Sequence, residues 1–294
     1  MEISVVVCTR NRANYLDRML ISLQQLQVPD GLEWEIIFVN NGSSDNTRPV
    51  LESSQKRFSV PVKIIDEDRP GLSYARNVGW KEASGRIIAF TDDDCYPHSD
   101  WLAQIHQVLG DPHVGYVGGR VLLFDLTDAP VTIQISELTK DFPKGSHIES
   151  GNIIGANMAF KRQLLDQVQG FDCRLGAGTR LRAGEDTDLL IRASLAGFEG
   201  RYDPSIIVYH HHRRKPGADI HKLSSGYAYG RGALSMKTIL ESDAKSLYLK
   251  NWYWRIRSLI AKKRFLECLE EARGAVLFLS ESRKSKSSAF TKAG

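Results

Sequence analysis

The sequence predicts an α/β fold in which a mostly parallel sheet is flanked by helices and followed by a C-terminal helical extension. In the first hundred residues, short apolar runs alternate with segments whose apolar residues recur at helical spacing. The runs are continuously apolar, as in parallel strands that are buried on both faces. After about residue 213 this alternation stops, and aromatic and basic residues become frequent. Strands that alternate with helices are typical of α/β domains with a parallel sheet.

The first four strands are predicted by the apolar runs at 3–8, 34–39, 60–65 and 86–91. Helices are predicted between them, with Asn14 capping the first and Ser44 or Asp45 capping the second. Ligands of such sheets bind beyond the carboxyl ends of the strands. We therefore expect the loop at 40–45 and the aspartates at 92–94 to lie on one edge of the sheet.

The pattern is weaker after residue 100. Strands are predicted at 114–124 and 206–209, and helices at 101–109 and 186–196, while 153–160 is a further apolar run. The mixed polarity of 126–150 indicates a substrate loop. Residues 246–279 are predicted to be helical, and the Ser/Lys-rich residues 280–294 to be disordered. We divide the chain into an α/β domain, 1–212, and a region of flexible loop, basic and aromatic helix and disordered tail, 213–294.

The composition is that of a globular protein, with 42% hydrophobic and 25% charged residues. The four cysteines are far apart in sequence and form no CxxC pair, which favours a reducing compartment. The first residues lack the basic region of a signal peptide, and no apolar run has the length of a membrane span. We therefore expect a cytoplasmic protein.

Charge is distributed unevenly along the chain. Residues 245–294 hold twelve Lys/Arg and four Asp/Glu, a net +8, whereas the whole chain carries +4. Trp252, Tyr253 and Trp254 lie among these cations. This mixture suits peripheral contact with the inner face of the cytoplasmic membrane, and it also suits packing on the core or on another subunit. No nucleic-acid motif accompanies it, so we expect no nucleic-acid partner.

Three consecutive aspartates, Asp92, Asp93 and Asp94, follow the fourth apolar run. Carboxylates this close repel one another unless a cation or a set of donors compensates them. Mg²⁺ and Mn²⁺ take oxygen ligands and often bind one or two carboxylates together with substrate phosphates. The block therefore predicts a metal–diphosphate site, with a solvated acidic loop as the alternative.

Six segments that occur in order resemble the motifs of glycosyltransferase family 2, the inverting GT-A enzymes. The resemblance covers about residues 3 to 212 and implies a Rossmann-like GT-A sheet. Its motifs are 6–12, 39–47, 71–79, 91–94, 155–157 with 170–172, and 184–189. The resemblance also implies that the nucleotide-sugar donor is bound by Thr9, Arg10, Asn11, Arg12, Asn40, Asn41, Asp45, Arg76, Asn77, Asp92 and Asp93.

One position departs from the family. Relatives that use uracil often have an aspartate where this chain has Asn40. An amide both donates and accepts hydrogen bonds, so uracil, thymine and guanine all stay open. For Arg76 a structural salt bridge is the alternative to a phosphate contact.

The family match implies that Asp186 is the general base and that Glu185 contacts the acceptor or orients this base. Asn157 is expected on the acceptor side. An acidic helix start that favours the helix dipole is the alternative explanation for the two acidic residues.

The cofactor implied is Mn²⁺ or Mg²⁺, held by Asp94 together with Asp92, His210 and His212. Alternation along an extended backbone predicts that Asp92 and Asp94 point to one side. It likewise places His210 and His212 on one side and His211 on the other. The residues 213–215 are expected to close over the diphosphate as a loop.

The resulting prediction is an inverting, metal-dependent glycosyltransferase that acts on a hydroxyl of a polysaccharide or lipid-linked glycan of the cell envelope. A sugar-phosphate nucleotidyltransferase and a catalytically silent glycan-binding scaffold are the alternatives. The segment 176–181 resembles the glycine-rich nucleotidyltransferase signature, but it lies in mid-chain, so we interpret it as a loop near the acceptor. The sequence leaves the sugar, the acceptor and the linkage open.

Overall fold

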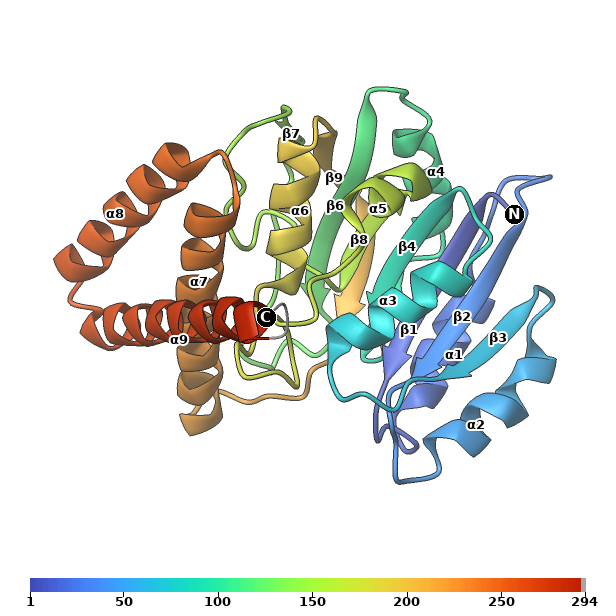
Figure 1. Ribbon diagram of the computed structural model, residues 1–294. Coiled ribbons are helices and arrows are strands. Elements are labelled where there is room, and N and C mark those ends of the chain that lie inside the picture. Colours follow the sequence, from blue (N-terminus) through green and yellow to red (C-terminus); the bar gives the residue numbers. More distant parts are fainter. Residues whose placement is uncertain (292–294) are drawn as a thin grey trace.

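A single mixed sheet with helices on both faces forms most of the chain in this computed structural model (Figure 1). The structure describes residues 1–291, without the side chains of 218, 219 and 283–291. The spatial order of the strands is β3-β2-β1-β4-β8-β6-β9-β5, and β7 pairs with β9. The predicted α/β class with flanking helices is thereby confirmed.

The first part of the sheet is parallel, as predicted. It consists of β1 (Ile3–Thr9), β2 (Trp34–Asn40), β3 (Val62–Asp66) and β4 (Ile87–Asp92). All seven residues of β2 are buried. Because these strands are covered on both faces, their sequences are continuously apolar.

The remaining strands are mostly antiparallel. They are β5 (Cys95–Pro97), β6 (Val114–Leu123), β7 (Lys140–Phe142), β8 (Asn157–Lys161) and β9 (Glu199–His210). β8 pairs antiparallel with β4 and β6, β5 and β7 pair antiparallel with β9, and β6 runs parallel to β9. The sequence analysis missed β5 and β7, because three residues are too few to show a periodicity. It also began the last strand at 206, whereas β9 begins at Glu199.

Two sets of helices cover the two faces. One face carries α1 (Leu16–Gln24), α2 (Thr47–Ser54) and α4 (Trp101–Leu109), and the other carries α3 (Leu72–Glu82), α5 (Arg162–Val168) and α6 (Glu185–Leu195). Neighbouring residues of β1 contribute to different cores, since Val5 and Val7 lie in one and Val6 in the other. α5 was not predicted.

The predicted helix caps are partly wrong. Tyr15, not Asn14, occupies the N-cap position of α1 and makes no side-chain cap bond. At α2 the N-cap position is Asn46, but Asp45 Oδ1 accepts the N–H of Thr47 at 3.0 Å. Asp45 therefore satisfies a free N–H of the helix start from one residue further out.

The C-terminal extension contains α7 (Ala218–Glu241), α8 (Lys245–Ala261) and α9 (Phe265–Thr291). The loop predicted after residue 213 is thus helical from Ala218. Residues 280–291, predicted to be disordered, are the last turns of α9; neither Gly nor Pro occurs between 275 and 291 to end the helix. Residues 292–294 of that prediction lie outside the described residues.

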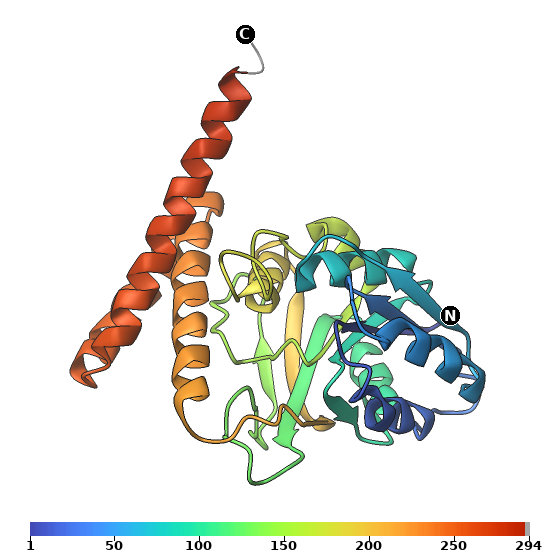
Figure 2. The ribbon, with the colours of Figure 1, turned by 90° about the horizontal axis from the view of Figure 1, so that it is seen from below.

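α7 lies alongside α9 (Figure 2), and glycines allow the two helices to approach closely. A Cβ on Gly232 would lie 1.8 Å from the carbonyl oxygen of Glu271, and one on Gly274 would lie 1.9 Å from that of Tyr229. Only glycine permits these backbone contacts. None of the described helices combines the length and the hydropathy that a membrane span requires.

A buried ion cluster fixes α7 to the α/β domain. Lys237 Nζ lies 3.1 Å from Asp172 Oδ2 and also contacts Asp188 on α6. Arg174 and Arg192 pair with the same two aspartates. The extension is therefore joined to the segment that precedes α6 and to α6 itself.

Candidate active site

A cleft of about 730 Å³ lies at the carboxyl ends of β1 and β4. The two loops that were expected to share an edge of the sheet both contribute to it. The predicted site residues that line it are Thr9, Arg10, Arg12, Asn41, Arg76, Asp92, Asp93, Asp94, Glu185, Asp186 and His210. Most of the predicted residues therefore gather at one place.

The aspartate block divides between two groups of partners. Asp92 ends β4, and the chain then turns through Asp93 and Asp94. Asp92 Oδ1 lies 3.1 Å from Nη2 of Arg76, whereas Asp94 Oδ1 lies 3.3 Å from Nε2 of His210. The expectation that Asp92 and Asp94 point to one side as in an extended strand is wrong, because the backbone turns between them.

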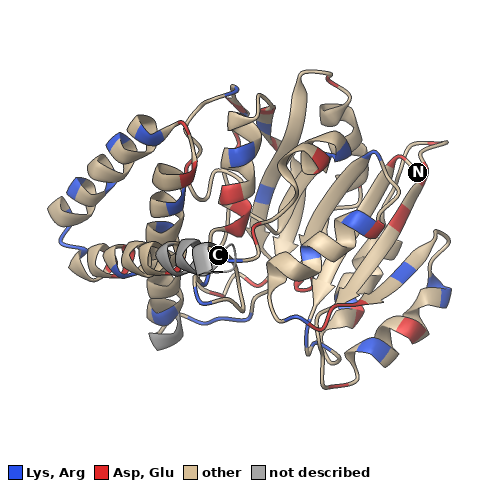
Figure 3. Ribbon diagram, in the orientation of Figure 1, with Lys and Arg blue, Asp and Glu red and all other residues tan. Residues whose placement is uncertain are grey.

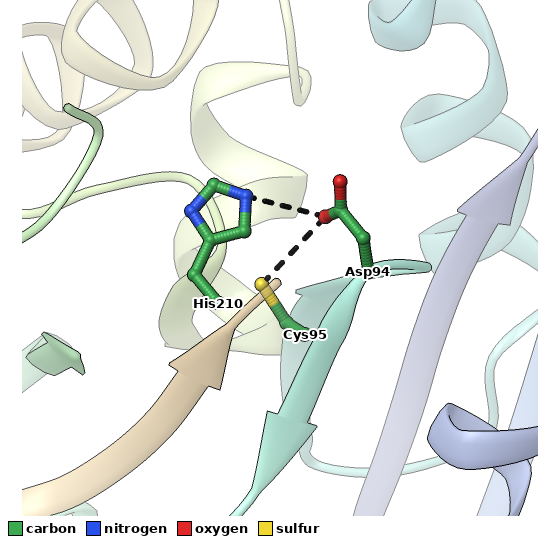
Figure 4. Close-up of side chains that lie close together, drawn as sticks. All are labelled: Asp94, Cys95 and His210. Carbon is green, nitrogen blue, oxygen red and sulfur yellow. Dashed lines mark hydrogen bonds and ion pairs between the residues drawn. The ribbon is translucent and has the colours of Figure 1, made fainter. Parts of the chain in front are cut away.

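Strand pairing brings Asp94 and His210 together. β5 and β9 are antiparallel with Cys95 opposite His210, so Asp94 lies beside the imidazole (Figure 4). Burial raises the pKa of Asp94, but the hydrogen bond and the charge of His210 outweigh this effect and lower it below the ordinary value. Burial conversely lowers the pKa of His210, and Asp94 raises it above the ordinary value.

These groups fit a hard divalent cation. Asp94 supplies a carboxylate and His210 an imidazole, two ligand types that Mn²⁺ accepts beside phosphate oxygens. Cys95 is buried beside these two residues, but its soft sulfur is not a preferred ligand of a hard cation such as Mg²⁺ or Mn²⁺. Arg12 lies 3.4 Å from Asp94 Oδ2 and 3.3 Å from Asp93 Oδ1 and partly neutralises the block. Burial and the neighbouring Asp94 raise the pKa of Asp93 to about 7, against the effect of Arg12.

His212 does not offer a nitrogen to this site. Its Nε2 lies 3.1 Å from the carbonyl oxygen of Ala129, and its Nδ1 accepts the N–H of Arg214 at 3.0 Å. The rings of His210 and His212 are 5.0 Å apart, so the predicted alternation of the histidines is confirmed. His211 lies on the other side, 3.0 Å from the hydroxyl of Tyr96. Backbone bonds thus occupy both ring nitrogens of His212, and we do not propose it as a metal ligand.

Arg76 connects the aspartate block with the acidic pair of α6. It is only 3% exposed, and its guanidinium reaches Asp92, Glu185 at 3.1 Å and the carbonyl oxygen of Gly155 at 3.2 Å. Of the two roles considered for Arg76, a phosphate contact and a structural salt bridge, the structure contains the salt bridge. Burial and the charge of Asp186 raise the pKa of Glu185 to about 7, although Arg76 opposes this effect.

Asp186 faces the cleft on the first turn of α6. Its Oδ2 accepts the N–H of Gly155 at 3.0 Å, and its Oδ1 accepts the N–H of Thr187 at 2.6 Å. A Cβ on Gly155 would lie 3.0 Å from Arg76 Nη2 and 3.2 Å from Asp186 Oδ2. The carboxylate is thus held in place by backbone donors and keeps lone pairs for a proton from a bound hydroxyl.

Three of the residues that were predicted to bind the nucleotide sugar connect loops at the rim of the cleft. Asn11 Oδ1 accepts the N–H of Ser44 at 2.8 Å, and Asp45 Oδ2 accepts that of Ala13 at 3.2 Å. The Nδ2 of Asn40 donates to Asp66 at 2.8 Å. The buried Oδ1 of Asn40 has no hydrogen-bond partner among the described residues, so it is available to a donor.

The side chains of Asn77 and Asn157 are bonded to other parts of the chain. Asn77 accepts the N–H of Phe171 at 2.8 Å and donates to its carbonyl oxygen, which joins α3 to the loop before α6. Asn157 is fully buried; it accepts from the indole of Trp101 at 2.9 Å and donates to two backbone carbonyls. Their side chains are fully engaged, so we propose neither as a ligand-binding residue.

Several cleft residues were missed. Thr132 comes from the loop after β6, and Tyr227 and Arg231 come from α7. Nothing in the local sequence marks the two α7 residues, because only the packing of α7 brings them to the cleft. Of the predicted closing loop 213–215, only Arg214 lines the cleft.

The other residues of that loop lie elsewhere. Arg213 stacks over the ring of Tyr15, 4.6 Å from its centroid. Lys215 Nζ pairs with Asp125 at 3.0 Å and with Asp128 at 2.7 Å. Because Lys215 neutralises both carboxylates, we interpret Asp125, Asp128 and Lys215 as an ion cluster and not as a second metal site.

A second cavity of about 360 Å³ adjoins the cleft. It lies among the loop 147–150, α6, α7 and α8, and it shares Ser150, Thr187 and Arg231 with the cleft. Since Thr187 follows Asp186, the cavity begins on the Asp186 side of the cleft.

The chain is similar in sequence to proteins with known names. It is 24% identical over 208 residues to the glycosyltransferase AglE of Haloferax volcanii, covering 71% of this chain and 66% of that protein. It is 26% identical over 221 residues to the pre-mycofactocin glycosyltransferase of Mycobacterium tuberculosis, covering 72% and 43%. The chain thus spans less than two thirds of the length of these relatives.

Solved structures show the same fold. The mannosyltransferase PcManGT from Pyrobaculum calidifontis, in complex with GDP-Man and Mn²⁺, aligns with a TM-score of 0.66 at 19% identity, over 97% of this chain and 80% of that one. Residues 1–349 of S. aureus TarS, in complex with UDP, align with a TM-score of 0.64 at 18% identity, over 84% and 68%.

Sequence models of two families match the chain. The model for glycosyl transferase family 2 matches residues 4–169, more than half of the chain, and the model for glycosyl transferase family group 2 matches residues 87–269. The first match contains β1 to β4, the aspartate block and β8. The chain therefore belongs to glycosyl transferase family 2.

Proposed function

We propose that this chain is an inverting, metal-dependent glycosyltransferase that moves a sugar from a nucleoside-diphosphate sugar to a hydroxyl. One observation carries the proposal: Asp186 and the pair of Asp94 and His210 line the same cleft. They stand on either side of the ion-paired series Asp92, Arg76 and Glu185. Glycosyl transfer needs a base for the acceptor at one place and compensation of the leaving diphosphate at another.

The donor would lie against the first part of the sheet. Arg10, Arg12 and Arg214 are among the arginines that line the cleft, and their guanidinium groups suit a diphosphate. The free Oδ1 of Asn40 suits an N–H of the base. The similar structures hold UDP and GDP-Man, which supports a nucleoside-diphosphate sugar as the donor class.

Asp94 and His210 are the residues that would hold Mn²⁺ or Mg²⁺. When bound, such a cation neutralises the charge that develops on the leaving diphosphate. The structure of PcManGT with Mn²⁺ supports this choice of cofactor. Asp92, committed to Arg76, would position the guanidinium rather than bind the cation.

Asp186 would act on the acceptor. Its carboxylate takes the proton of the acceptor hydroxyl while that oxygen bonds to the anomeric carbon, and the bond to the diphosphate breaks. Inversion follows from this direct displacement. Glu185, paired with Arg76, would hold the side of the cleft that contains Asp186 in a fixed position relative to the aspartate block.

The second cavity supports an acceptor that is longer than one sugar. It continues the cleft from the Asp186 side and ends among residues of α8. TarS is named a poly(ribitol-phosphate) β-N-acetylglucosaminyltransferase, which supports a polymer of the cell envelope as the acceptor class. A polysaccharide and a lipid-linked glycan both fit this description.

The test is a product assay with UDP-, GDP- and dTDP-sugars in the presence of Mn²⁺. Release of a nucleoside diphosphate that depends on acceptor is expected, whereas pyrophosphate release would indicate a nucleotidyltransferase. A thermal-shift series with UDP, GDP and TDP selects the donor class first, because a ligand that binds only the folded state raises the Tm. A chain that neither binds nor releases any nucleotide would contradict the proposal.

The metal ligand can be tested separately by Asp94→Ala. This variant should lose most of the Mn²⁺-dependent part of nucleotide binding, since it removes the carboxylate that contacts His210. Asp166→Ala on the exposed surface of α5 is the matched control. Equal Mn²⁺ dependence in both variants would remove Asp94 from the proposed site.

A further inference from the structure

The turn between α8 and α9 forms a tip at the end of the extension that lies far from the sheet (Figures 1 and 2). All seven residues from 260 to 266 are exposed. Three of them are large and apolar: Ile260 is 50% exposed, Phe265 61% and Leu266 63%. Exposing adjacent apolar side chains is unfavourable in water, and grouped patches of this kind mark interaction surfaces.

The apolar surface continues along α8. Leu249, Tyr253 and Trp254 are each more than half exposed. Leu249, Tyr253 and Ile260 recur at the spacing of one helix face, and Trp254 extends the exposed apolar surface to one side of it. We call these four residues together with Phe265 and Leu266 the tip face. It combines aliphatic side chains with the rings of tyrosine and tryptophan, which are apolar but carry one polar O–H or N–H group each.

All charged residues of the segment that carries the tip face are basic. Residues 244–266 contain seven Lys/Arg and no Asp/Glu, and Figure 3 shows α8 with basic residues alone. Lys250, Lys262 and Lys263 are exposed. Arg257 lies over the rings of Tyr253 and Trp254, 5.8 and 5.2 Å from their centroids, and holds its charge beside them.

Charge decides between the partners that could cover this surface. A second copy of the chain, bound through the same face, would bring two sets of cations together. Glu267, the acid that follows Leu266, already pairs with Arg264 and Arg231 and is not free to compensate them. A nucleic acid would compensate the charge but would leave Leu249, Ile260 and Leu266 without an apolar environment. The surface of an anionic bilayer provides both lipid phosphates and hydrocarbon.

We propose that the tip face docks this protein on an anionic phospholipid bilayer. Ile260, Phe265 and Leu266 enter the boundary of headgroups and acyl chains, the rings of α8 lie at the headgroup level, and the cations contact lipid phosphates. The docking is peripheral and reversible, since its charge contribution is screened by salt.

Docking would also bring the acceptor side of the cleft near the bilayer. Lys262 and Arg264 at the tip line the second cavity, and the same cavity reaches Ser150 and Thr187 at the cleft. A lipid-linked glycan anchored in the bilayer would have a path to Asp186. This consequence rests on the proposed function, whereas the docking itself does not.

The test is flotation of the full chain with vesicles of phosphatidylglycerol and phosphatidylcholine, compared with vesicles of phosphatidylcholine alone. Wild type should float with the anionic vesicles only, and less so as salt rises. Phe265→Ser with Ile260→Ser should lower the partition coefficient at least tenfold. Lys250→Gln with Lys263→Asn should lower it about 25-fold, near fivefold for each cation.

Matched controls are available on the α/β domain. Leu126→Ser with Leu138→Ser removes two exposed apolar residues, and Lys56→Gln with Lys144→Gln removes two exposed cations. Both controls should float as wild type does. All variants should keep the thermal shift caused by the nucleoside diphosphate, which separates a failure of docking from a failure of the proposed transferase.

Three results would overturn the proposal. In the first, the wild-type protein does not bind anionic vesicles. In the second, the tip variants float as the control variants do. In the third, light scattering shows a dimer of the wild type that the double substitution of Phe265 and Ile260 abolishes. Binding to single-stranded RNA that is tighter than to vesicles and insensitive to the apolar pair would assign the cations to nucleic acid instead.

Discussion

The cleft of the α/β domain and the tip of the extension use charge in opposite ways. In the cleft, Asp94 and Glu185 are buried, and each contacts a particular cationic or imidazole group. At the tip, Lys250 and Lys263 are exposed and belong to the segment 244–266, which contains no Asp or Glu. A buried charge acts through single short contacts, whereas exposed charges act together and over longer distances. Single substitutions should therefore have large effects in the cleft and graded effects at the tip.

The largest effect is expected from Asp186→Asn. The amide cannot take the proton of the acceptor, so turnover should fall by roughly 10² to 10⁴. Binding of the nucleoside diphosphate, measured by thermal shift, should be unchanged. Glu137→Gln at a highly exposed position is the control. Wild-type turnover of the Asp186 variant would show that another group acts as the base.

Lys237→Met tests the junction of the two regions. Lys237 is buried in the extension and pairs with Asp172 and Asp188 of the α/β domain. Its removal leaves two buried carboxylates with fewer partners, and the free energy of unfolding should fall by roughly 3 kcal/mol. Denaturant unfolding measures this, with Lys144→Met on the surface as the control. Equal stability of both variants would mean that the packing of α7, and not the ion cluster, joins the regions.

Gly155→Ala tests how closely the buried charged groups of the cleft are packed. The new methyl group would press on both Arg76 and Asp186, at 3.0 and 3.2 Å. We expect turnover to fall about tenfold and stability by about 1–3 kcal/mol. Gly226→Ala is the control, because a Cβ there meets nothing within 4 Å. Full activity of Gly155→Ala would show that the cleft tolerates a shift of these side chains.

The smallest effect concerns pH. Burial raises the pKa of Asp172, but Arg174 and Lys237 outweigh it and hold the pKa well below the ordinary value. A carboxyl with a lowered folded-state pKa stabilises the protein above its unfolded pKa of about 4, and this contribution is lost as the pH falls further. The stability difference between wild type and Asp172→Asn should thus be constant from pH 7 to 5 and shrink towards pH 3. Urea unfolding at each pH measures it, and a difference that grows on acidification would contradict the ion cluster.

Much of the fold could be predicted because local patterns decide it. The runs that form β1 to β4 are apolar throughout, and α4 was predicted with the limits that the structure shows. The short strands β5 and β7, the helix α5 and the glycine-containing helix α7 give no clear period. Their structure depends on pairing with β9 or on packing against distant elements, which sequence periodicity does not report.

The same division holds for the site. Asp94, His210, Glu185 and Asp186 were predicted and do lie at one cleft. The side chains of Asn77, Asn157 and His212 were predicted to bind ligands. In the folded chain they bond to backbone carbonyls that lie 94, 49 and 83 positions away in sequence. The residue types of a motif show which chemistry a site could perform. The hydrogen-bond partners of those residues in the fold decide whether their polar atoms are available to a ligand.

The sequence by itself determined the strands β1 to β4 with the helices between them, the acidic residues at the end of β4 and the start of α6, and the basic segment 244–266. These features depend on side-chain type and on neighbours within a few positions. Only the tertiary structure decided that Asp94 meets His210 through the register of β5 and β9, that Arg76 ties Asp92 to Glu185, and that α7 completes the cleft. Such contacts join residues far apart in the chain, so they arise only when the whole sheet and the extension pack together.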